Sequence, residues 1–398
     1  GADSMHPVCR LLSILLCALS CTAPICACAQ AAVPELGTFK QFDIPSNEGT
    51  DFVRRLGAGW NLGNTLDAID DSFRGNDLDL EGYWCQVKTT REMIQTVHAA
   101  GFSSIRLPTS WHNHVNADFT INEAWMNRVQ EIVDWCLDEG LYVILNTHHD
   151  EGEATFYPDS AHSASSERYL TAIWQQIADR FRDYDEHLIF ESMNEPRLKG
   201  TSYEWYLDPS SEACVDSAKE IARLNQVFVD TIRAGGGSNE TRFLMIPGYD
   251  ASVDGALSEY YVLPTDTISD HLLVSVHAYT PYDFALNTSG TSSFSAQNQN
   301  DRSVVASFMN HLYNRFVANG IPVVIGEYGA LDKNNLQDRV DFFAWYVASA
   351  ACRGMPCLVW DNNAFHSRGE NFGYLQRADL TWPFPEILEA IRTYSLKN

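Results

Sequence analysis

Basic residues are scarce in this sequence. It has 27 Lys and Arg against 52 Asp and Glu, which gives a net charge of −25 over 398 residues. Nucleic acids and anionic membrane surfaces carry charge of the same sign and would be repelled. We therefore expect no nucleic acid and no membrane among its partners, whereas a neutral polymer would meet no such barrier.

Cysteine is also scarce once the first 30 residues are set aside. Five of the ten cysteines lie in those residues, and the others are Cys85, Cys136, Cys214, Cys352 and Cys357. An odd and scattered set is not a disulfide framework, although the last two could form a bridge. No C-x-x-C or H-x-x-x-H spacing accompanies them, so we expect no metal site and no cofactor.

The apolar run at residues 11–19 is too short to span a bilayer. It follows basic residues and precedes a small-residue site that ends at Ala29, which is the layout of a secretory signal. We predict a signal at residues 5–29, cleaved near Ala29, behind a cloning scar at residues 1–4, and hence a secreted protein. A lipid anchor at Cys21 is the alternative, but the larger aliphatic residue usual three positions earlier is missing.

Linkers and repeats are absent from the rest of the sequence, so we expect a single domain. Residues 30–50 read as an N-terminal lead-in, and residues 51–398 as one catalytic domain that is most simply a monomer. Strand-like and helical segments alternate from residue 56 onward. Strands are expected at residues 57–63, 102–108, 141–147, 187–193, 242–247, 272–276, 321–325 and 357–360, and helices at 88–100, 124–139, 166–181, 213–234, 304–318, 336–351 and 384–394.

Eight strands alternating with helices predict an α/β fold, the (β/α)8 TIM barrel. A doubly wound open sheet is the alternative. It is disfavoured because no glycine-rich phosphate loop follows the first strand.

Two apolar segments each lead into a carboxylate. HLIFESMNEP, at residues 187–196, contains Glu195, and IPVVIGEYGA, at residues 321–330, contains Glu327. A charge at the end of a buried strand is costly to desolvate, so it occurs mainly where it does chemistry. Either glutamate alone could be the polar cap of a strand. Two in matching context favour a glycosidase pair, which needs one carboxylic acid and one carboxylate.

Further polar residues fall at the C-terminal ends of the expected strands, which form the active-site face of a barrel. They are Arg106, His148, Asn194, His277, Tyr279 and Trp360. Arg106 is suited to hold Glu327 ionised, and Tyr279 to donate to the same carboxylate. The amide and the imidazoles can bind sugar hydroxyls, and the indole offers a flat platform for a sugar ring.

Each of these residues also has a structural interpretation. Arg106 could be an ion-pair partner of the fold, the histidines could serve packing, and Trp360 could be core. His149 follows His148 directly and should face the opposite side of the strand, so we do not assign it to the site.

The sequence resembles glycoside hydrolase family five, and within it the endo-β-glucanases of subfamily four. The motifs are GWNLGNTLDA at residues 59–68, IRLPTSWHNH at 105–114, MNEP at 193–196, SVHAYTPYDF at 275–284, IGEYGA at 325–330 and VWDNN at 359–363. The resemblance implies a retaining barrel enzyme with Glu195 as acid/base and Glu327 as nucleophile. It also implies that Arg106, His148, Asn194, His277, Tyr279 and Trp360 line the site.

Asn61, in the first motif, is similar to a family residue that lines the cleft on the non-reducing side. VWDNN departs from the WWDNG of many related sequences, which affects the last loop but not its Trp. The expected activity is a secreted, retaining endo-β-1,4-glucanase acting on a β-glucan polysaccharide.

Three alternatives remain open at this point. The first is another enzyme on the same scaffold, a xyloglucanase, mixed-linkage glucanase or mannanase, which the loops around the site would decide. The second is an inactive carbohydrate-binding protein, disfavoured because both carboxylates and their supporting residues are present. The third is a metallohydrolase using His148, His149 and Asp150, disfavoured by the expected opposite orientation of the adjacent histidines.

Overall fold

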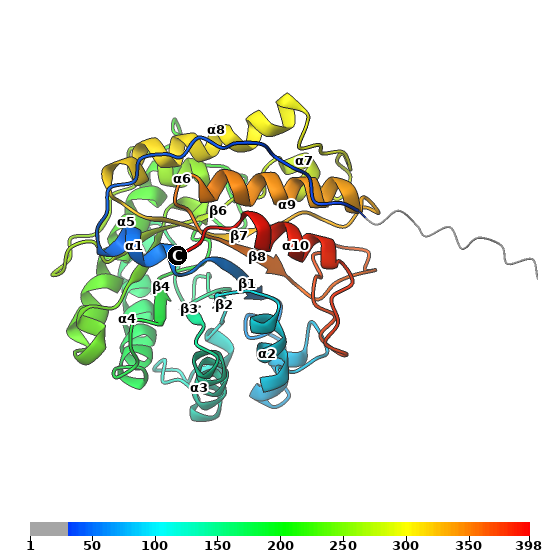
Figure 1. Ribbon diagram of the computed structural model, residues 1–398. Helices are drawn as coiled ribbons and strands as arrows, with labels where there is room; N and C mark the ends of the chain where they lie inside the picture. The colour runs from blue at the N-terminus through cyan, green and yellow to red at the C-terminus, as the bar shows by residue number, and fades with distance from the viewer. Residues whose placement is uncertain (1–30) are drawn as a thin grey trace, which may run out of the picture. The chain divides into compact units, whose positions relative to one another are not determined.

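The structure, a computed structural model, describes residues 31–398 (Figure 1). The predicted signal therefore lies outside the described residues. Eight strands form a closed parallel barrel in chain order, and β8 pairs with β1. The strands are β1 (Ala58–Leu62), β2 (Ser104–Leu107), β3 (Tyr142–Asn146), β4 (Leu188–Glu191), β5 (Leu244–Pro247), β6 (Leu272–His277), β7 (Val323–Tyr328) and β8 (Cys357–Asp361). The predicted (β/α)8 barrel is confirmed.

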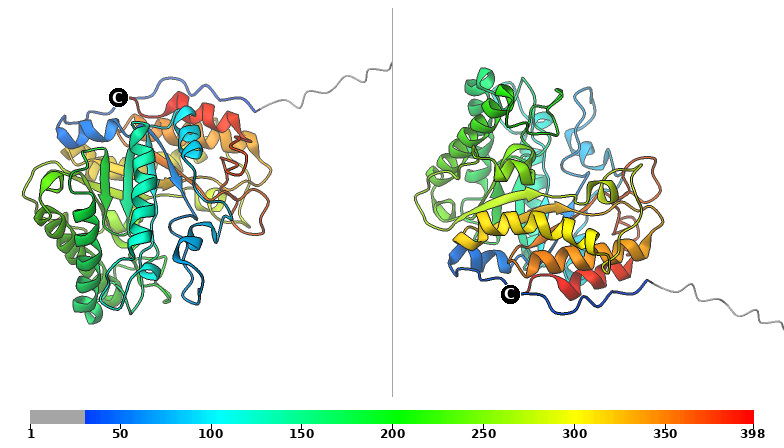
Figure 2. Two further views of the ribbon diagram at one scale, coloured as in Figure 1. Left: turned by 90° about the horizontal axis from the view of Figure 1, so that it is seen from below. Right: turned by 90° about the horizontal axis from the view of Figure 1, so that it is seen from above.

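Helices surround the barrel on its outside (Figure 2). The long ones were all expected from the sequence: α2 (Arg91–Ala99), α3 (Glu123–Asp138), α4 (Ser163–Arg180), α5 (Glu212–Ala234), α8 (Gln299–Arg315), α9 (Leu336–Ala351) and α10 (Pro385–Tyr394). Most of them bury an apolar stripe, as helices around a parallel sheet do, whereas α9 is buried on nearly all sides. No helix among residues 31–398 is long and apolar enough to cross a membrane.

Three short helices were not expected: α1 (Glu48–Arg54), α6 (Val253–Leu257) and α7 (Tyr282–Ala285). They are too short for a helical period to stand out in a sequence. Helix α1 does have a local signal, because Asn47 caps the backbone N–H of Thr50 while the Thr50 hydroxyl accepts from the N–H of Asn47. The predicted boundary between lead-in and catalytic domain falls inside this helix.

Helix α1 closes the N-terminal end of the barrel. The ring of Phe52 stacks on Phe243 with 3.7 Å between centroids and 7° between planes. Around it lies a buried apolar cluster made of Val53, Leu56, Ile144, Ile189, Met245, Leu273, Val324 and Leu358. The cluster fills the barrel below the catalytic face, so the interior is core rather than a channel.

The lead-in runs as an extended segment along α8 and α9 (Figure 1). Phe39 packs on Trp345 of α9 at 5.1 Å between ring centroids, and Phe42 on Tyr313 of α8 at 4.7 Å. Further along the chain, the Tyr394 hydroxyl donates to the carbonyl of Pro34 at 2.6 Å. The lead-in is therefore bound to the barrel although it has little regular structure.

The five cysteines in the described part of the chain are free thiols. Cys352 and Cys357, which could have formed a bridge, are both buried. The Cys352 sulfur lies 3.2 Å from the carbonyl of Ser349, and that of Cys357 lies 3.9 Å from the carbonyl of Met355.

Strand register decides which polar side chains become neighbours. Asn61 of β1 lies beside Arg106 of β2 on one side and Trp360 of β8 on the other. His277, the last residue of β6, pairs with Glu327 of β7 after a shift in register. In a parallel barrel these positions all lie toward the C-terminal face, so the fold gathers them there.

We predict that Phe52→Ala lowers the free energy of unfolding by about 3–5 kcal/mol, because it leaves a cavity under the barrel. Urea unfolding followed by circular dichroism measures the change. The folded variant should keep its turnover number, since Phe52 lies at the end of the barrel away from Glu195 and Glu327. Val304→Ala, at an exposed position of α8, is the control and should change stability little. A loss in Phe52→Ala no larger than in this control would contradict the packing role of α1.

Candidate active site

The guanidinium of Arg106 is the centre of a buried polar network. It donates to Glu191 Oε1 from Nε and Nη2, at 3.0 and 2.7 Å, and to Glu327 Oε2 from Nη1 at 2.7 Å. Its remaining N–H groups reach Asn61 Oδ1 at 3.0 Å and Asn194 Oδ1 at 2.7 Å. Burial lowers the pKa of Arg106, but the two carboxylates more than offset this and the net shift is upward. The side chain is therefore a fixed positive charge.

Glu191 is a site residue that our sequence analysis missed. Its Oε1 also accepts from Asn146 Nδ2 at 3.0 Å, and its Oε2 accepts from the Ser275 hydroxyl at 2.7 Å. We expected the fourth strand to run into Glu195, but β4 ends at Glu191, and Glu195 lies on the irregular segment after it. The carboxylate at the strand end is thus the partner of Arg106. Glu195 lies beyond the strand, on the loop that follows it.

Glu327 is held from both sides by hydrogen-bond donors. Besides the contact of Oε2 with Arg106, its Oε1 accepts from the Tyr279 hydroxyl at 2.7 Å. Burial and then the charge of Glu327 raise the pKa of Tyr279 well above its ordinary value, so the phenol keeps its proton and remains a donor. Two donors on one carboxylate favour its charged form.

Glu195 lies close to Glu327, with His277 between them. His277 Nδ1 is 2.7 Å from Glu195 Oε2 and 3.5 Å from Glu327 Oε2. One oxygen of each carboxylate and a ring nitrogen of His277 all lie within 4.8 Å of one another. The side chain of Glu195 is 21% exposed against 7% for Glu327. The two carboxylates therefore sit in one site with different access to water.

The neighbouring groups decide whether Glu195 or His277 carries the proton that the two share. Burial raises the pKa of Glu195, but the hydrogen bond and charge of His277, with Arg197 and Arg106, outweigh burial and lower it. Burial lowers the pKa of His277, whereas the charges of Glu327 and Glu195 raise it, and the net shift is upward. In the free protein, the proton shared by Glu195 and His277 therefore favours the ring.

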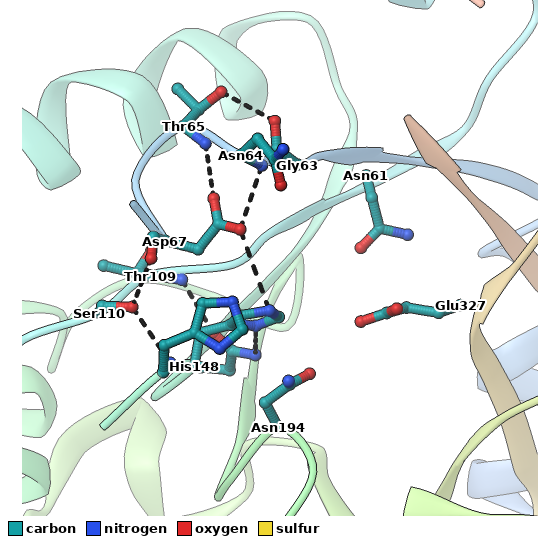
Figure 3. Close-up of polar contacts among 12 residues, drawn as sticks. Asn61, Gly63, Asn64, Thr65, Asp67, Thr109, Ser110, His148, Asn194 and Glu327 are labelled. Atoms are coloured by element: carbon teal, nitrogen blue, oxygen red, sulfur yellow. Dashed lines mark hydrogen bonds and ion pairs between the residues drawn. The ribbon is translucent and has the colours of Figure 1, made fainter. Parts of the chain in front are cut away.

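His148 lines the other side of the site, facing the loop after β1 (Figure 3). Its Nδ1 lies 3.1 Å from Asn146 Nδ2, and its Nε2 lies 4.0 Å from Asp67 Oδ2. Burial lowers the pKa of His148 well below its ordinary value, so the ring is neutral. Because Asn146 Nδ2 is a donor, the ring nitrogen facing it accepts, and Nε2 carries the proton.

Asp67 was not assigned from the sequence although it lies in the first motif. Its two oxygens accept the backbone N–H of Thr65 at 2.6 Å and of Asn64 at 3.1 Å (Figure 3). Burial raises the pKa of Asp67 to about 7, against the lowering effect of these hydrogen bonds. Asp67 fixes the turn after β1 and places a carboxyl group near His148.

Our expectation for His149 is wrong. Its ring lies 4.5 Å from that of His148, centroid to centroid, and 5.8 Å from that of Trp84. Strand β3 ends at Asn146, so the alternation of sides no longer applies to the two histidines. A nitrogen of each histidine and an oxygen of Asp67 come within 4.8 Å of one another, close enough to share a metal ion.

Trp360 lies on the last strand with its ring nearly parallel to that of His148, at 3° and 6.0 Å between centroids. The indole packs over Gly63, where a Cβ atom would lie 2.8 Å from the ring. A side chain at position 63 would therefore push the indole aside. Asn61, below it, donates from Nδ2 to the carbonyl of Gly326 at 2.9 Å.

All the residues named in advance lie around this one cluster. Asn61, Arg106, Asn194, Glu195, His277, Tyr279 and Glu327 are joined by direct hydrogen bonds. His148 joins them through Asn146 and Glu191, and Trp360 faces His148. A buried cation, two nearby carboxylates and a flat aromatic ring are what hydrolysis of a glycosidic bond requires.

Residues 66–366 match the family model described as cellulase (glycosyl hydrolase family 5). The chain belongs to this family. Endoglucanase 1 of Ruminococcus albus is 43% identical over 369 residues, covering 92% of this chain and 86% of that protein. The chain is therefore a glycoside hydrolase of the endoglucanase type, and the resemblance to the family is confirmed.

Solved structures of family members support the same assignment. A lichenase mutant from Caldicellulosiruptor sp. F32 in complex with cellotetraose has a TM-score of 0.90 at 47% identity, covering 92% of this chain and all (100%) of that one. A GH5-4 broad specificity endoglucanase from Ruminococcus champanellensis with bound cellotriose has a TM-score of 0.82 at 44% identity, covering 88% and 100%. The resemblance to subfamily four is confirmed as well.

We predict that Glu191→Ala lowers the free energy of unfolding by about 3–5 kcal/mol, because it leaves part of a buried arginine unpaired. Urea midpoints measured at constant salt give the comparison. Glu186→Ala is the matched control, because Glu186 pairs with Arg55 at the surface with both side chains exposed. It should change the midpoint little. Equal effects of the two substitutions would mean that Glu191 does not stabilise Arg106.

Proposed function

We propose that the protein is a secreted endo-β-1,4-glucanase that cleaves internal bonds of β-glucans with retention of configuration. Glu195 is the acid/base and Glu327 the nucleophile. Arg106, His277 and Tyr279 hold these two groups, and Asn61, His148, Asn194 and Trp360 bind the sugar. Secretion rests on the signal-like pattern of residues 5–29.

The separation of the two carboxylates carries the proposal for the mechanism. Carboxyl groups lie about 5–5.5 Å apart in retaining glycosidases and about 6.5–9.5 Å apart in inverting ones, which must fit a water molecule between carboxylate and sugar. One oxygen of Glu195 lies within 4.8 Å of one oxygen of Glu327, which fits the shorter of these two ranges. This spacing supports direct attack by a carboxylate on the anomeric carbon.

The surroundings of the two carboxylates support their separate roles. Glu327 accepts from Arg106 and Tyr279, so it is the group that is kept ionised and aimed as a nucleophile. Glu195 is more exposed and is bonded to His277, which can deliver a proton. A sugar bound against Glu195 excludes water from it, which favours its neutral acid form.

The reaction then has two displacements. Glu327 attacks the anomeric carbon while the bond to the leaving oxygen breaks, and that oxygen takes the proton of Glu195. In the second step Glu195, now a carboxylate, takes a proton from water. The water oxygen attacks the anomeric carbon, releases Glu327 and leaves the sugar with its original configuration.

Aromatic side chains around the mouth of the barrel fit a long neutral polymer. Exposed rings stand on three of the loops that follow strands: Tyr83 and Trp84 after β1, Trp205 and Tyr206 after β4, and Tyr282 after β6. Sugar rings stack on such faces. With the exposed edge of Trp360, they suit a cleft that binds several sugars rather than a pocket for a chain end.

A mixed-linkage glucanase or xyloglucanase is the second candidate. Among the similar structures are the lichenase named above and a xyloglucan-specific endo-β-1,4-glucanase, the latter 36% identical with a TM-score of 0.80. Comparing the products formed from carboxymethyl-cellulose, xyloglucan, lichenan and mannan separates these activities. Short oligosaccharides from carboxymethyl-cellulose support the main proposal, and turnover of xyloglucan or lichenan alone favours the second.

We predict that Glu327→Ala abolishes hydrolysis of every β-glucan that the wild-type protein cleaves, by at least about 10³-fold in kcat. Reducing-sugar release at substrate saturation is the measurement, and unchanged circular dichroism shows that the variant is folded. If the variant kept activity within tenfold of wild type, Glu327 would not be the nucleophile. If the folded wild-type protein bound these glucans without cleaving any, it would be a carbohydrate-binding protein.

We further predict that azide distinguishes the two carboxylates. Glu195→Ala can still form the glycosyl-enzyme from an aryl glycoside with a good leaving group, and azide needs no general base to attack it. The product should be the β-glycosyl azide. Glu327→Ala forms no such intermediate, so azide can only attack from the opposite face and give the α-azide. Proton NMR gives the anomeric configuration of each product. If Glu195→Ala gave the α-azide and Glu327→Ala the β-azide, the two roles would be exchanged.

A further inference from the structure

Arg197 lies two residues after Glu195 and is buried. Its Nη1 donates to the backbone carbonyl of Glu195 at 2.9 Å. Its Nε and Nη2 donate to one oxygen of Glu204 at 3.1 and 2.8 Å. The guanidinium also lies 4.1 Å from the ring centroid of Trp205, a side chain that is 64% exposed. One side chain thus joins Glu195 to a later part of the same loop, the connection between β4 and α5.

Two further carboxylates hold Arg197 in this place. Glu151 Oε1 lies 3.5 Å from Arg197 Nη1, and both oxygens of Glu151 are buried and have no hydrogen-bond partner. Burial raises the pKa of Glu151 to about 7, although the charge of Arg197 lowers it. Asp250, whose Oδ1 is also buried without a partner, is close enough to raise the pKa of Arg197. The positive charge of Arg197 compensates the negative charge of these carboxylates.

The segment that carries Glu195 is anchored just before it at Ser192, whose N–H donates to the carbonyl of Met245 at 3.3 Å and whose carbonyl accepts from the Thr147 hydroxyl at 2.9 Å. It is irregular from Ser192 onward, because β4 ends at Glu191. Between Met193 and Pro196 the backbone is contacted by Arg197 and by the N–H of Asp250, which donates to the carbonyl of Pro196 at 2.7 Å. Asp250 has a left-handed conformation, with φ of 57°, which costs free energy for a residue other than glycine. The backbone position of Glu195 therefore depends on its hydrogen bond with Arg197.

We propose that Arg197 is a positioning residue for proton donation, which it serves by fixing the backbone of Glu195 against Glu204 and Trp205. This inference rests on the proposed role of Glu195 as general acid. Arg197 acts through Glu195, whose backbone carbonyl it contacts. Its effect is on the distance between the Glu195 carboxyl group and the leaving oxygen, and a displacement of about 1 Å can cost about 100-fold in rate.

Leaving groups of different acidity distinguish positioning from a general loss of structure. A sugar leaves as a poor leaving group and needs its oxygen protonated, whereas 2,4-dinitrophenolate leaves without a proton. The value of kcat/KM reports the first displacement for both kinds of substrate. A misplaced general acid therefore lowers kcat/KM for a cello-oligosaccharide and spares an aryl cellobioside.

The experiment compares kcat/KM of Arg197→Gln on cellotetraose and on 2,4-dinitrophenyl β-cellobioside. We expect a loss of about 100-fold on the first substrate and almost none on the second. An equal loss on both substrates, or no loss on either, would overturn the inference. If Arg197→Gln does not fold, Glu204→Gln weakens the same grip and should show the same division between substrates, to a smaller extent.

Two control variants complete the design. Arg128→Gln breaks another largely buried pair, between Arg128 of α3 and Glu81, and should lower stability without separating the two substrates. Glu195→Ala must lose kcat/KM on cellotetraose and keep it on 2,4-dinitrophenyl β-cellobioside. If Glu195→Ala shows no such division, the proposed role of Glu195 fails. If Glu195→Ala shows the division and Arg197→Gln does not, only the inference about Arg197 fails.

Discussion

The buried charge of Arg106 is the constraint on which the rest of the site depends. A guanidinium inside a barrel is tolerable only when every N–H has an acceptor and the charge is balanced. Glu191 and Glu327 balance it, and Asn61 and Asn194 complete the acceptors. These four residues come from three separate parts of the chain, so the barrel must be closed in the correct register before the charge is accommodated. The network therefore links folding of the barrel to assembly of the site.

The same network gives the two carboxylates different properties without separating them. Glu327 lies on a rigid strand and shares the fixed cation with a structural partner, Glu191. Glu195 lies beyond the end of β4, on an irregular segment, beside a histidine that can gain or lose a proton. Rigid support suits a nucleophile that must stay ionised. A more exposed position beside an imidazole suits a group that must change its protonation state in each half of the reaction.

The sequence was enough to predict the barrel and most of the site. Eight strand-like segments in alternation with helices leave few other folds, and the strand ends of a barrel share one face. It was not enough to identify Glu191, because an acidic residue two positions inside an expected strand end looks no different from one at its end. The exact end of β4 depends on pairing with β5, which only the folded barrel defines.

The error for His149 has a related cause. Alternation of sides is a property of extended, paired backbone, and β3 stops before the histidines. Asp67 and Arg197 were missed for a different reason. Their roles depend on contacts that follow no periodic pattern: Asp67 lies near the distant His148, and Arg197 contacts Glu195 and Glu204 within one irregular loop. Short helices such as α1 carry a capping signal, but their length hides the helical period.

Closure of the barrel also brings its two ends together. Strand β8 pairs along its whole length with β1, and Arg54 at the end of α1 donates to the carbonyl of Lys397 at 2.9 Å. A ring of strands has no structural beginning, so the pairing of β8 with β1 does not depend on which strand comes first in the chain. New ends could then open in an exposed loop elsewhere, as circular permutants of compact domains allow. The order in which the strands are synthesised is thus a separate property from the order in which they pair.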